Sequence, residues 1–496
     1  MIGNLKALIV VLGIALVVFA LVKPVCLRFM GAAAFARRRN VWLILTVSAF
    51  LTPSFWAYAL IAIPLLGWMS SKDDNPLAVY LLFLCVVPPW AFEIPTVGIS
   101  KLFDLSQYRI LSLVVLLPAA WRFITSGDRQ SRKFTLADGL LLAYGGLQIL
   151  LYLPYESPTN SIRRTLLFGL DIYLPFFVAK NCCRSREEIV EALAAFGLTC
   201  ALLAPLAAFE AARTWVLYAQ VGEHWGYEDL EPYLLRGSML RAQASTGHPL
   251  SLGYLMAMGF GFWLYLRSRV ADRRSVPLIG SLWMWLGLLA AYSRGPWLTA
   301  GVVYFLFLFQ HPSGGSRLLR SLVVVGIAFG LVLISPLGER IIDNLPFVGS
   351  VDQQNVVYRE RLAATSWMLI QRNPFFGDPF VLLQMEDLRQ GQGIIDLMNA
   401  YASIALFYGL TGLALFLMFN LHGILKATLA LRRCRNVDPD MSLLGSCLVA
   451  CMMGTMFFMA TAGFTSLQYV LMGLLASYVA LVPTRMPAPS HAAWPA

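Results

Sequence analysis

Six arginines lie at or near the ends of long apolar runs of the sequence. Arginine is costly at membrane depth, and chains usually keep it there to hold an anion. The planar guanidinium group can donate two parallel hydrogen bonds, which suits it to phosphates. The six residues are Arg163, Arg164, Arg241, Arg294, Arg359 and Arg361. Any one of them could be an ordinary loop or snorkelling arginine, but their expected position on one side of the membrane predicts an anion-binding cavity.

Other side chains with chemical potential lie in the loop at residues 210–249. His248 falls in the segment Ser-Thr-Gly-His-Pro, immediately before an apolar run. A histidine exchanges protons near neutral pH, so His248 is a candidate acid or base, or else it caps the helix that begins there. Trp225 and Tyr227 could stack on sugar rings. Aromatic residues also form belts at membrane interfaces, and both interpretations stay open.

Signatures of the common soluble enzymes are absent from the sequence. It contains no nucleophile elbow, no P-loop and no zinc-binding spacing. Asp438 and Asp440 resemble a metal-binding pair, but Pro439 separates them within a basic connector, which favours a solvated turn. We therefore predict neither a metal ion nor a cofactor.

The elements that position these residues are predicted to be membrane-spanning helices. Of 496 residues, 58% are hydrophobic and 13% are charged, whereas soluble domains carry roughly a quarter charged residues. Apolar runs that are long enough to cross a hydrocarbon core of ~30 Å recur along the chain. The runs are residues 5–22, 41–68, 77–90, 111–123, 136–153, 166–178, 189–209, 250–266, 278–292, 296–309, 322–334, 400–419, 443–462 and 467–481. Pro53 and Ser54 divide the second run into a hairpin, so the sequence predicts an all-α, polytopic transmembrane bundle of about twelve to fifteen spans.

The basic residues indicate the orientation of the chain. The net charge is +11, and the arginine clusters fall in alternate connectors, which the positive-inside rule assigns to the cytoplasm. This topology explains the charge without nucleic acid. Two long connectors, residues 210–249 and 336–399, then lie on the outer side, where long loops are commonly functional. We expect residues 1–496 to form a single integral membrane domain with a flexible cytoplasmic tail at 483–496.

Four motifs, in this order, resemble the landmarks of the O-antigen ligase and polysaccharide polymerase superfamily. They are Arg-Ala-Gln-Ala-Ser-Thr-Gly-His-Pro-Leu-Ser-Leu-Gly at 241–253, Tyr-Ser-Arg-Gly-Pro-Trp-Leu at 292–298, the stretch 361–377 that ends in Asn-Pro-Phe-Phe-Gly, and the stretch 399–412. The resemblance covers residues 154–419, and the order of the motifs makes it more specific than any one motif.

The resemblance implies a metal-independent membrane glycosyltransferase of the GT-C type at the periplasmic face of a bacterial inner membrane. Its donor would be an oligosaccharide linked to undecaprenyl diphosphate, within surrounding membrane lipids. Negative charge accumulates when the diphosphate leaves, and preorganised arginines would stabilise that charge. The candidates for this role are Arg164, Arg241, Arg294 and Arg361, with Arg163 and Arg359 as further substrate-binding residues.

The chain departs from the superfamily pattern at Met398. Ligases of the group carry a His-Asn pair before a Gly-x-x-Gly, and alignment on the glycines puts Asn399 on the asparagine and Met398 on the histidine. A thioether cannot take up a proton. Asp396 or His248 would then serve as the general base, or departure of the diphosphate would precede proton removal. Tyr401 keeps the family's aromatic position, or it simply packs between helices.

These observations favour a polymerase that joins repeat units of an exported polysaccharide or O-antigen. The alternative within the family is a ligase that moves finished glycan to lipid A core or to a protein. A third hypothesis is a transporter or flippase of lipid-linked sugars, but such proteins commonly show internal repeats, which this sequence lacks. A flippase and a chain-length regulator are the protein partners expected of a polymerase.

Overall fold

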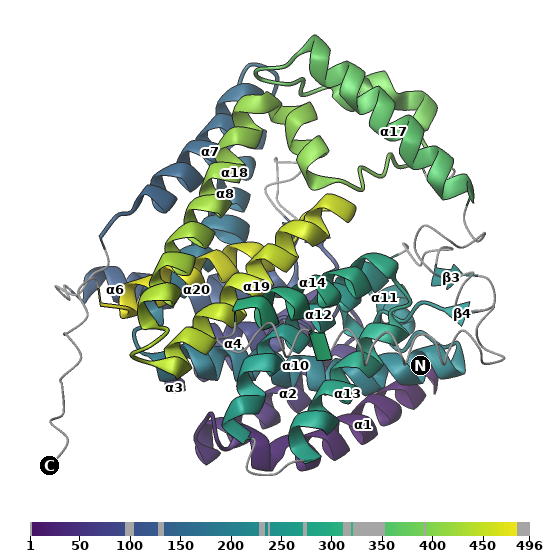
Figure 1. The fold of residues 1–496 in the computed structure, drawn as a ribbon. Helices are drawn as coiled ribbons and strands as arrows, with labels where there is room; N and C mark the ends of the chain where they lie inside the picture. Colours follow the sequence, from purple (N-terminus) through teal and green to yellow (C-terminus); the bar gives the residue numbers. More distant parts are fainter. Residues whose placement is uncertain are drawn as a thin grey trace, which may run out of the picture.

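The computed structural model describes residues 2–94, 104–126, 133–227, 234–236, 239–270, 275–310, 319–320, 353–390 and 393–483, and within them the chain is almost entirely helical. Within these described ranges, six helices are long and apolar enough to cross a membrane. They cover Gly3–Cys26, Gln107–Thr125, Arg186–Arg213, Pro249–Val270, Ala400–Cys434 and Pro439–Thr461. The predicted all-α polytopic bundle is confirmed (Figure 1), while the total number of spans stays a prediction.

The first part of the chain supplies most of the bundle. Its elements are α1 (Ile2–Cys26), α2 (Ala32–Leu51), α3 (Phe55–Lys72), α4 (Pro76–Phe83), β1 (Phe92–Glu93), β2 (Asp104–Leu105), α5 (Gln107–Leu111), η1 (Ser112–Leu116), α6 (Leu117–Thr125), α7 (Leu136–Tyr152), α8 (Pro158–Phe168), η2 (Gly169–Tyr173), α9 (Leu174–Cys182) and α10 (Arg186–Arg213). The predicted division of residues 41–68 is confirmed, because Ser54 accepts the N–H of Ala57 at 3.3 Å and starts α3.

The second part completes the bundle and adds the outer elements. These are α11 (Ala219–His224), β3 (Leu235–Arg236), β4 (Met239–Leu240), η4 (Ala244–Thr246), α12 (Pro249–Leu266), η5 (Arg267–Val270), α13 (Ser275–Ala290), α14 (Arg294–Gln310), α17 (Gln353–Arg372), η6 (Val381–Leu388), α18 (Ala400–Cys434), α19 (Pro439–Thr461) and α20 (Leu467–Leu481). Helices α12, α14 and α19 pack together, and α7 packs along α18 (Figure 1).

Arginines of several described connectors form ion pairs at one end of the bundle, here called the basic end. Arg38 on α2 contacts both Asp73, after α3, and Glu191, on α10, at 2.8 Å. Arg269, after α12, pairs with Asp440 on α19. The predicted topology assigns these helix ends to one side of the membrane. The ion pairs between them agree with that assignment. The opposite end, where the loop of Arg241 meets the turn between α13 and α14, is called the loop end.

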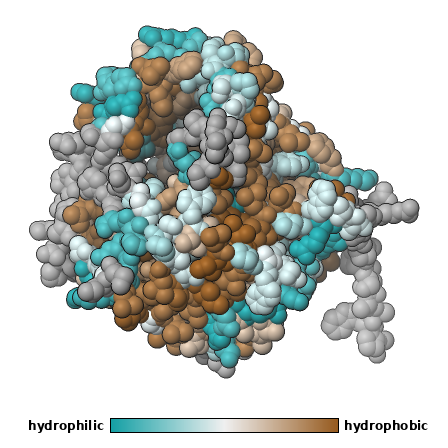
Figure 2. Space-filling model, turned by 180° about the vertical axis from the view of Figure 1, so that it is seen from behind, coloured by the Kyte–Doolittle hydropathy of each residue, from teal (hydrophilic) through white to brown (hydrophobic). Residues whose placement is uncertain are grey.

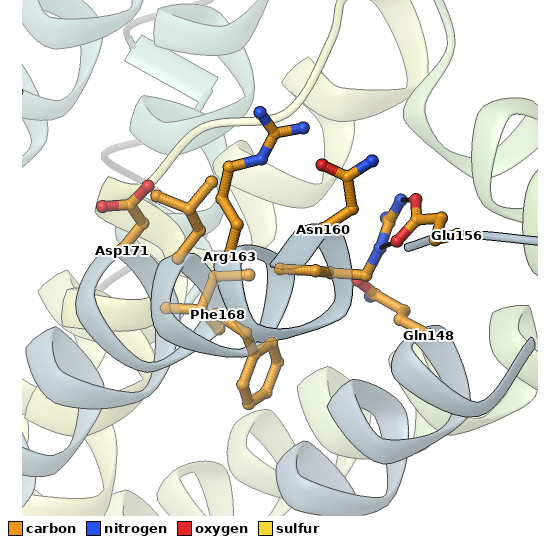
Figure 3. A pocket seen from close by; sticks show the side chains of 9 residues that line it. Gln148, Glu156, Asn160, Arg163, Phe168 and Asp171 are labelled. Carbon is orange, nitrogen blue, oxygen red and sulfur yellow. Dashed lines mark hydrogen bonds and ion pairs between the residues drawn. The ribbon is translucent and has the colours of Figure 1, made fainter. Parts of the chain in front are cut away.

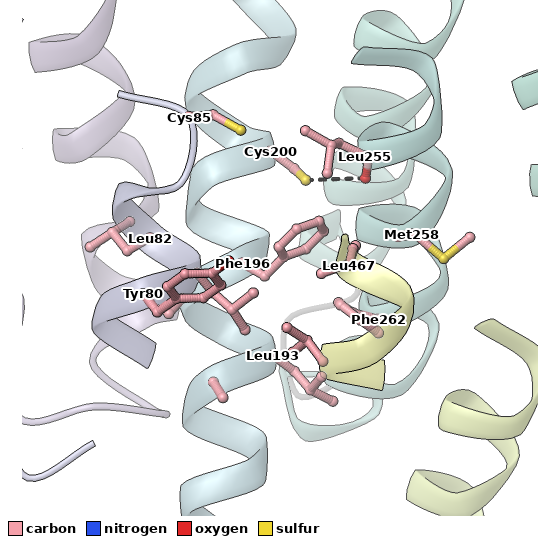
Figure 4. Packing of buried hydrophobic residues seen from close by; sticks show 14 of the residues in the cluster. Tyr80, Leu82, Cys85, Leu193, Phe196, Cys200, Leu255, Met258, Phe262 and Leu467 are labelled. Atoms are coloured by element: carbon pink, nitrogen blue, oxygen red, sulfur yellow. Dashed lines mark hydrogen bonds between the residues drawn. The ribbon is translucent and has the colours of Figure 1, made fainter. Parts of the chain in front are cut away.

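Helix α10 lies in the middle of the main hydrophobic core. A capping box starts it: Ser185 accepts the N–H of Glu188 at 3.2 Å, and the Glu188 carboxylate accepts the N–H of Ser185 at 3.2 Å. Phe196 of α10 packs edge-on against Phe262 of α12, with ring centroids 5.3 Å apart (Figure 4). Lipid is as apolar as these side chains, so close packing of this kind holds the helices together in a membrane.

The outer surface of the bundle is strongly apolar. Apolar residues cover much of the face shown in Figure 2, and hydrophilic residues gather toward its edges. Leu60 of α3, Trp121 of α6 and Leu150 of α7 are among the large side chains that are more than half exposed. An apolar surface of this extent is typical of helices that face lipid.

Residues 77–90 do not form the single helix that was predicted. Helix α4 ends at Phe83, and the chain turns through Pro88 and Pro89 before β1. Proline lacks the N–H that a helix needs, which explains the early end. The predicted span at 322–334, part of the loop at 336–399 and the predicted tail beyond residue 483 lie outside the described residues.

Candidate functional site

The loop that carries Arg241 follows the β3–β4 hairpin and leads into α12. The backbone N–H of Arg241 donates to the carbonyl of Leu234 at 2.7 Å. The N–H of Ala242 donates to the carbonyl of Ala290, the last residue of α13, at 3.0 Å. Arg241 itself is half-buried. The loop is therefore joined to the end of α13, four residues before Arg294.

A buried carboxylate that sequence reasoning missed supports this loop. Glu210, near the end of α10, is completely buried. Its Oε1 accepts the N–H of Leu217 at 2.8 Å, and its Oε2 accepts the N–H groups of Gln243 at 3.0 Å and Ala244 at 2.7 Å. Ala244 has a positive φ of 46°. The only sequence signal was a lone acidic residue at the end of an apolar helix.

Arg294 lies at the tight turn between α13 and α14. Tyr292 makes the turn with a φ of 45°. Pro296 packs so closely on α12 that a Cβ at Gly253 would come within 2.7 Å of it. The first two landmark motifs thus pack directly on each other, and they carry Arg241 and Arg294 to the same part of the loop end.

The end of α19 connects this pair of motifs to the fourth one. A Cβ at Gly295 would lie 3.3 Å from Thr461 Oγ1, near the end of α19. The next residue, Ala462, accepts the N–H of Ala400, the first residue of α18, at 3.2 Å. Asn399 therefore enters the same region as Arg294, although the two lie in distant parts of the sequence.

Asn399 and Tyr401 both make contacts that stabilise α18. The Asn399 side chain caps the helix, because its Oδ1 accepts the N–H groups of Tyr401 at 2.9 Å and Ala402 at 3.1 Å. The Tyr401 hydroxyl donates to the carbonyl of Met456 on α19 at 2.7 Å, and its ring packs edge-on against Phe416. These contacts support the helix-packing interpretation of Tyr401.

The Asn-Pro-Phe-Phe-Gly motif fits into a break in α18. Gly409 has a φ of 66° and a ψ of −173°, which interrupts the helix. Asp378 donates its N–H to the freed carbonyl of Leu406 at 2.8 Å, and Leu410 donates its N–H to the carbonyl of Pro374 at 2.7 Å. Non-helical backbone at membrane depth needs such partners, and here the motif provides them.

Two glycines make this fit close, and we call the pair the glycine interlock: Gly377 and Gly409. A Cβ at Gly377 would lie 2.4 Å from the carbonyl oxygen of Leu406, and a Cβ at Gly409 would lie 2.2 Å from that of Phe375. Both residues have positive φ. Neither position therefore accommodates a side chain. The motif is visible in the sequence, but only the structure pairs it with the helix break.

Helix α17 and the segment after it form a small unit with its own hydrophobic cluster, centred on Leu362, Met385 and Leu406. Arg359 and Arg361 are exposed on α17. Asp396 is half-buried beside Arg359; burial raises the pKa of its carboxyl, and the positive charge of Arg359 opposes that rise. Arg359 is thus near enough to Asp396 for its charge to act on the carboxyl.

His248 acts as the cap of α12. Its Nδ1 accepts the N–H of Leu250 at 3.1 Å. Burial, together with the positive charge of Arg241, lowers the pKa of His248 to about 4. The ring is therefore neutral at physiological pH, with Nδ1 occupied as an acceptor, so its single proton belongs on Nε2.

Residues 279–417 match the sequence model of the O-antigen ligase family. This segment is similar to O-antigen ligases. It runs from α13 into α18 and includes Arg294 and the glycine interlock, whereas Arg241 and His248 precede it. The matched family implies a membrane glycosyltransferase-like activity on lipid-linked glycans. No match was found among curated proteins.

Trp225 and Tyr227 precede the matched segment 279–417 and are involved in packing. Trp225 is 7% exposed, and its Nε1 donates to the carbonyl of Thr52 at 3.2 Å. Its ring contacts Phe55, with centroids 5.8 Å apart, and Tyr227 lies 5.4 Å from Trp90. The faces of Trp225 are therefore covered by protein, which leaves no ring surface for the sugar stacking that was considered.

Arg163 and Arg164, both on α8, line a pocket. The pocket has a volume of about 290 Å³ and lies between α7 and α8 (Figure 3). Its lining residues are Gln148, Glu156, Asn160, Arg163, Arg164, Leu167, Phe168, Asp171 and Ile172. Arg164 pairs with Glu156, so its charge is already compensated.

Asp438 and Asp440, the pair that resembles a metal site in the sequence, are engaged by other groups of the protein. Asp438 caps α19 by accepting the N–H of Met441 at 3.0 Å, and Asp440 pairs with Arg186 at 3.1 Å and with Arg269. Among the described residues, no group of three or more His, Cys, Asp or Glu side chains is arranged to hold a metal ion. Asp438 and Asp440 thus belong to an ion-pair network at the basic end.

Proposed function

We propose that this protein is a polymerase that transfers a glycan from undecaprenyl diphosphate to the next lipid-linked repeat unit, at the periplasmic face of a bacterial inner membrane. The observation that carries the proposal is the packing of two arginine-bearing motifs on each other. Arg241 and Arg294 come from loops that are joined by the hydrogen bond between Ala242 and Ala290. Two guanidinium groups in one region suit the two phosphates of a diphosphate.

Stabilisation of the leaving group is the main contribution of these arginines. The acceptor hydroxyl attacks the anomeric carbon, a new C–O bond forms, and the bond to the diphosphate breaks with its electron pair on the phosphate oxygen. Arg241 and Arg294 bind the charge that develops there, and donors that are already positioned need no reorganisation during the step. The chemistry of these two residues needs no metal ion.

Removal of the acceptor proton is assigned to Asp396. Its carboxyl is half-buried with a raised pKa, which makes it a stronger base than an exposed aspartate. His248 is less suited, because its Nδ1 already accepts the N–H of Leu250. Its Nε2–H is instead a hydrogen-bond donor that can bind an oxygen of the diphosphate beside Arg241. Arg361, exposed on α17, would contact the outer part of the substrate.

A polymerase is favoured over a ligase by Met398. The residue occupies the position at which ligases of the superfamily carry histidine, and a thioether cannot act as a base. The second candidate function is therefore a ligase that uses lipid A core or a protein as acceptor. Transport of lipid-linked sugars is the third, since arginines that face an anion would also serve a carrier.

The test is extension of an undecaprenyl-diphosphate-linked repeat unit by the purified full-length protein, with the chelator EDTA present. Wild type should produce a ladder of longer lipid-linked glycans, and Arg241→Ala and Arg294→Ala should each lower the rate by about 100-fold or more. Arg213→Ala, a change at an exposed arginine at the end of α10, should leave the rate unchanged. Movement of substrate across proteoliposomes without any extension would instead assign the arginines to a transporter.

A further inference from the structure

The two carboxylates in the α7–α8 pocket are each compensated by an arginine. Glu156 pairs with Arg164, whose guanidinium group also lies over the ring of Tyr152, 3.8 Å from its centroid. Asp171 is held by Arg109 of α5 through N–O distances of 2.9 to 3.2 Å. The acidic groups therefore add no net negative charge to the pocket.

The remaining charged side chain of the pocket is that of Arg163. It is half-buried, and within the described ranges none of the ion pairs includes it. Figure 3 shows Arg163 and Asn160 extending in the same direction from one face of α8, as expected for residues three positions apart in a helix. With Arg109 counted as the partner of Asp171, the charged groups at the pocket sum to +1, and Arg163 offers a guanidinium fork to an anion.

The rest of the lining suits a carbohydrate. Gln148 and Asn160 provide amide groups, which both donate and accept hydrogen bonds and so match sugar hydroxyls. Leu167 and Ile172 add apolar surface. The volume of about 290 Å³ is just below the range of ~300–1,000 Å³ for small-molecule sites. A single sugar residue fits this size better than a lipid diphosphate does.

The pocket lies beside the outer segment of α18. Tyr152, which supports Arg164, contacts Tyr408 of α18 with ring centroids 6.1 Å apart, and Tyr155 contacts Phe380 at 5.4 Å. From Tyr408 the helix leads back to Asn399 over a rise of about 13 Å. A glycan bound at the converging motifs could therefore place a more distant sugar in the pocket, and such remote contacts add binding energy to the reaction.

We propose that the α7–α8 pocket binds an acidic sugar residue of the substrate glycan, with Arg163 pairing with its carboxylate and Asn160 and Gln148 binding its hydroxyl groups. The assignment of the ligand as part of a glycan rests on the proposed function. The pocket would then select glycans with a negatively charged sugar at a fixed distance from the reacting bond.

The experiment measures binding of two probes to the purified full-length protein in detergent by calorimetry. The acidic probe is a hyaluronan tetrasaccharide, and the neutral probe is chitotetraose. Wild type should bind the acidic probe about tenfold more tightly than the neutral one, and Arg163→Gln should remove that preference. Asn160→Asp should do the same without deleting a cation, because the new carboxylate pairs with Arg163. Arg213→Gln, which makes the same charge change elsewhere, should keep the preference.

Several results would overturn the proposal. They are absence of binding of the acidic probe, equal affinity for both probes, or an unchanged preference in Arg163→Gln. Competition by inorganic phosphate, or by phosphatidylglycerol in nanodiscs, that matches the acidic probe would assign Arg163 to a phosphate instead. Probe binding does not depend on glycosyl transfer, so failure to extend lipid-linked glycans would refute the proposed function and leave this result standing.

Discussion

The carboxylate of Glu210 accepts the backbone N–H of Ala244 at 2.7 Å, and this bond connects the end of α10 to the loop that carries Arg241. The same carboxylate binds two further N–H groups, those of Leu217 and Gln243. A loop with a residue at positive φ, such as Ala244, is held in place only when its surroundings fix it. Glu210 is therefore a positioning residue for Arg241.

Replacement of Glu210 by glutamine should weaken this support. The new amide N–H₂ group would face backbone donors and leave at least one buried N–H without an acceptor, which costs about 2 kcal/mol. We expect a lower melting temperature and a lower rate of glycan extension in Glu210→Gln. Glu223→Gln, at an exposed residue of α11, is the matched control. If Glu210→Gln melts and reacts like wild type, the loop does not depend on the carboxylate.

Alanine at Gly409 should disrupt the glycine interlock. Its φ of 66° and ψ of −173° belong to a region that only glycine enters readily, and the added Cβ would overlap the carbonyl of Phe375. The expected cost is on the order of 3–5 kcal/mol, visible as a strong drop in melting temperature. Gly463→Ala, where a Cβ would meet no atom within 4 Å, should be nearly neutral. Similar melting of both variants would contradict the interlock.

Acid should destabilise the protein through His248. The folded state keeps the ring neutral down to a pKa of about 4, while an unfolded histidine has a pKa near 6.5. The unfolded state therefore binds the proton first, and stability is lost as pH falls from 6.5 toward 4, by up to about 3 kcal/mol. Asparagine is a good helix cap, so His248→Asn should fold and lose less stability between about pH 8 and about pH 4.5. Equal losses in both proteins would refute this assignment.

Replacement of Asp396 by asparagine should slow the reaction without unfolding the protein. Burial raises the pKa of Asp396, so the rate should fall as pH drops through that raised pKa. Asp396→Asn should lower the maximal rate by about 100-fold and abolish this acid limb. Asp387→Asn, at an exposed residue of η6, should keep both the rate and the pH profile. An acid limb that persists in Asp396→Asn would point to another base.

The regular parts of this fold were predictable because they follow from local physics. Hydropathy indicated the helices. Pro53 and Ser54 indicated the hairpin of α2 and α3, and Ser54 caps α3. The early end of α4 also had a signal in Pro88 and Pro89, since two prolines remove two helix donors.

The site was only partly predictable, because its contacts join distant segments. The arginines and motifs were found from the sequence, but nothing local indicates that Gly377 fits against Gly409. The role of Glu210 depends on a loop more than thirty residues away. For Trp225 the sequence favoured a surface role, whereas the tertiary packing of α11 against α3 buries the ring.

The glycine interlock changes what its motif means in other sequences. Asn-Pro-Phe-Phe-Gly and the segment of α18 around Gly409 satisfy each other's backbone groups. The motif therefore indicates a helix break whose free backbone groups have hydrogen-bond partners. It carries no information about which sugar is handled. A chain with both halves should share this architecture even when its glycan differs, whereas specificity should vary with residues elsewhere, such as those of α8.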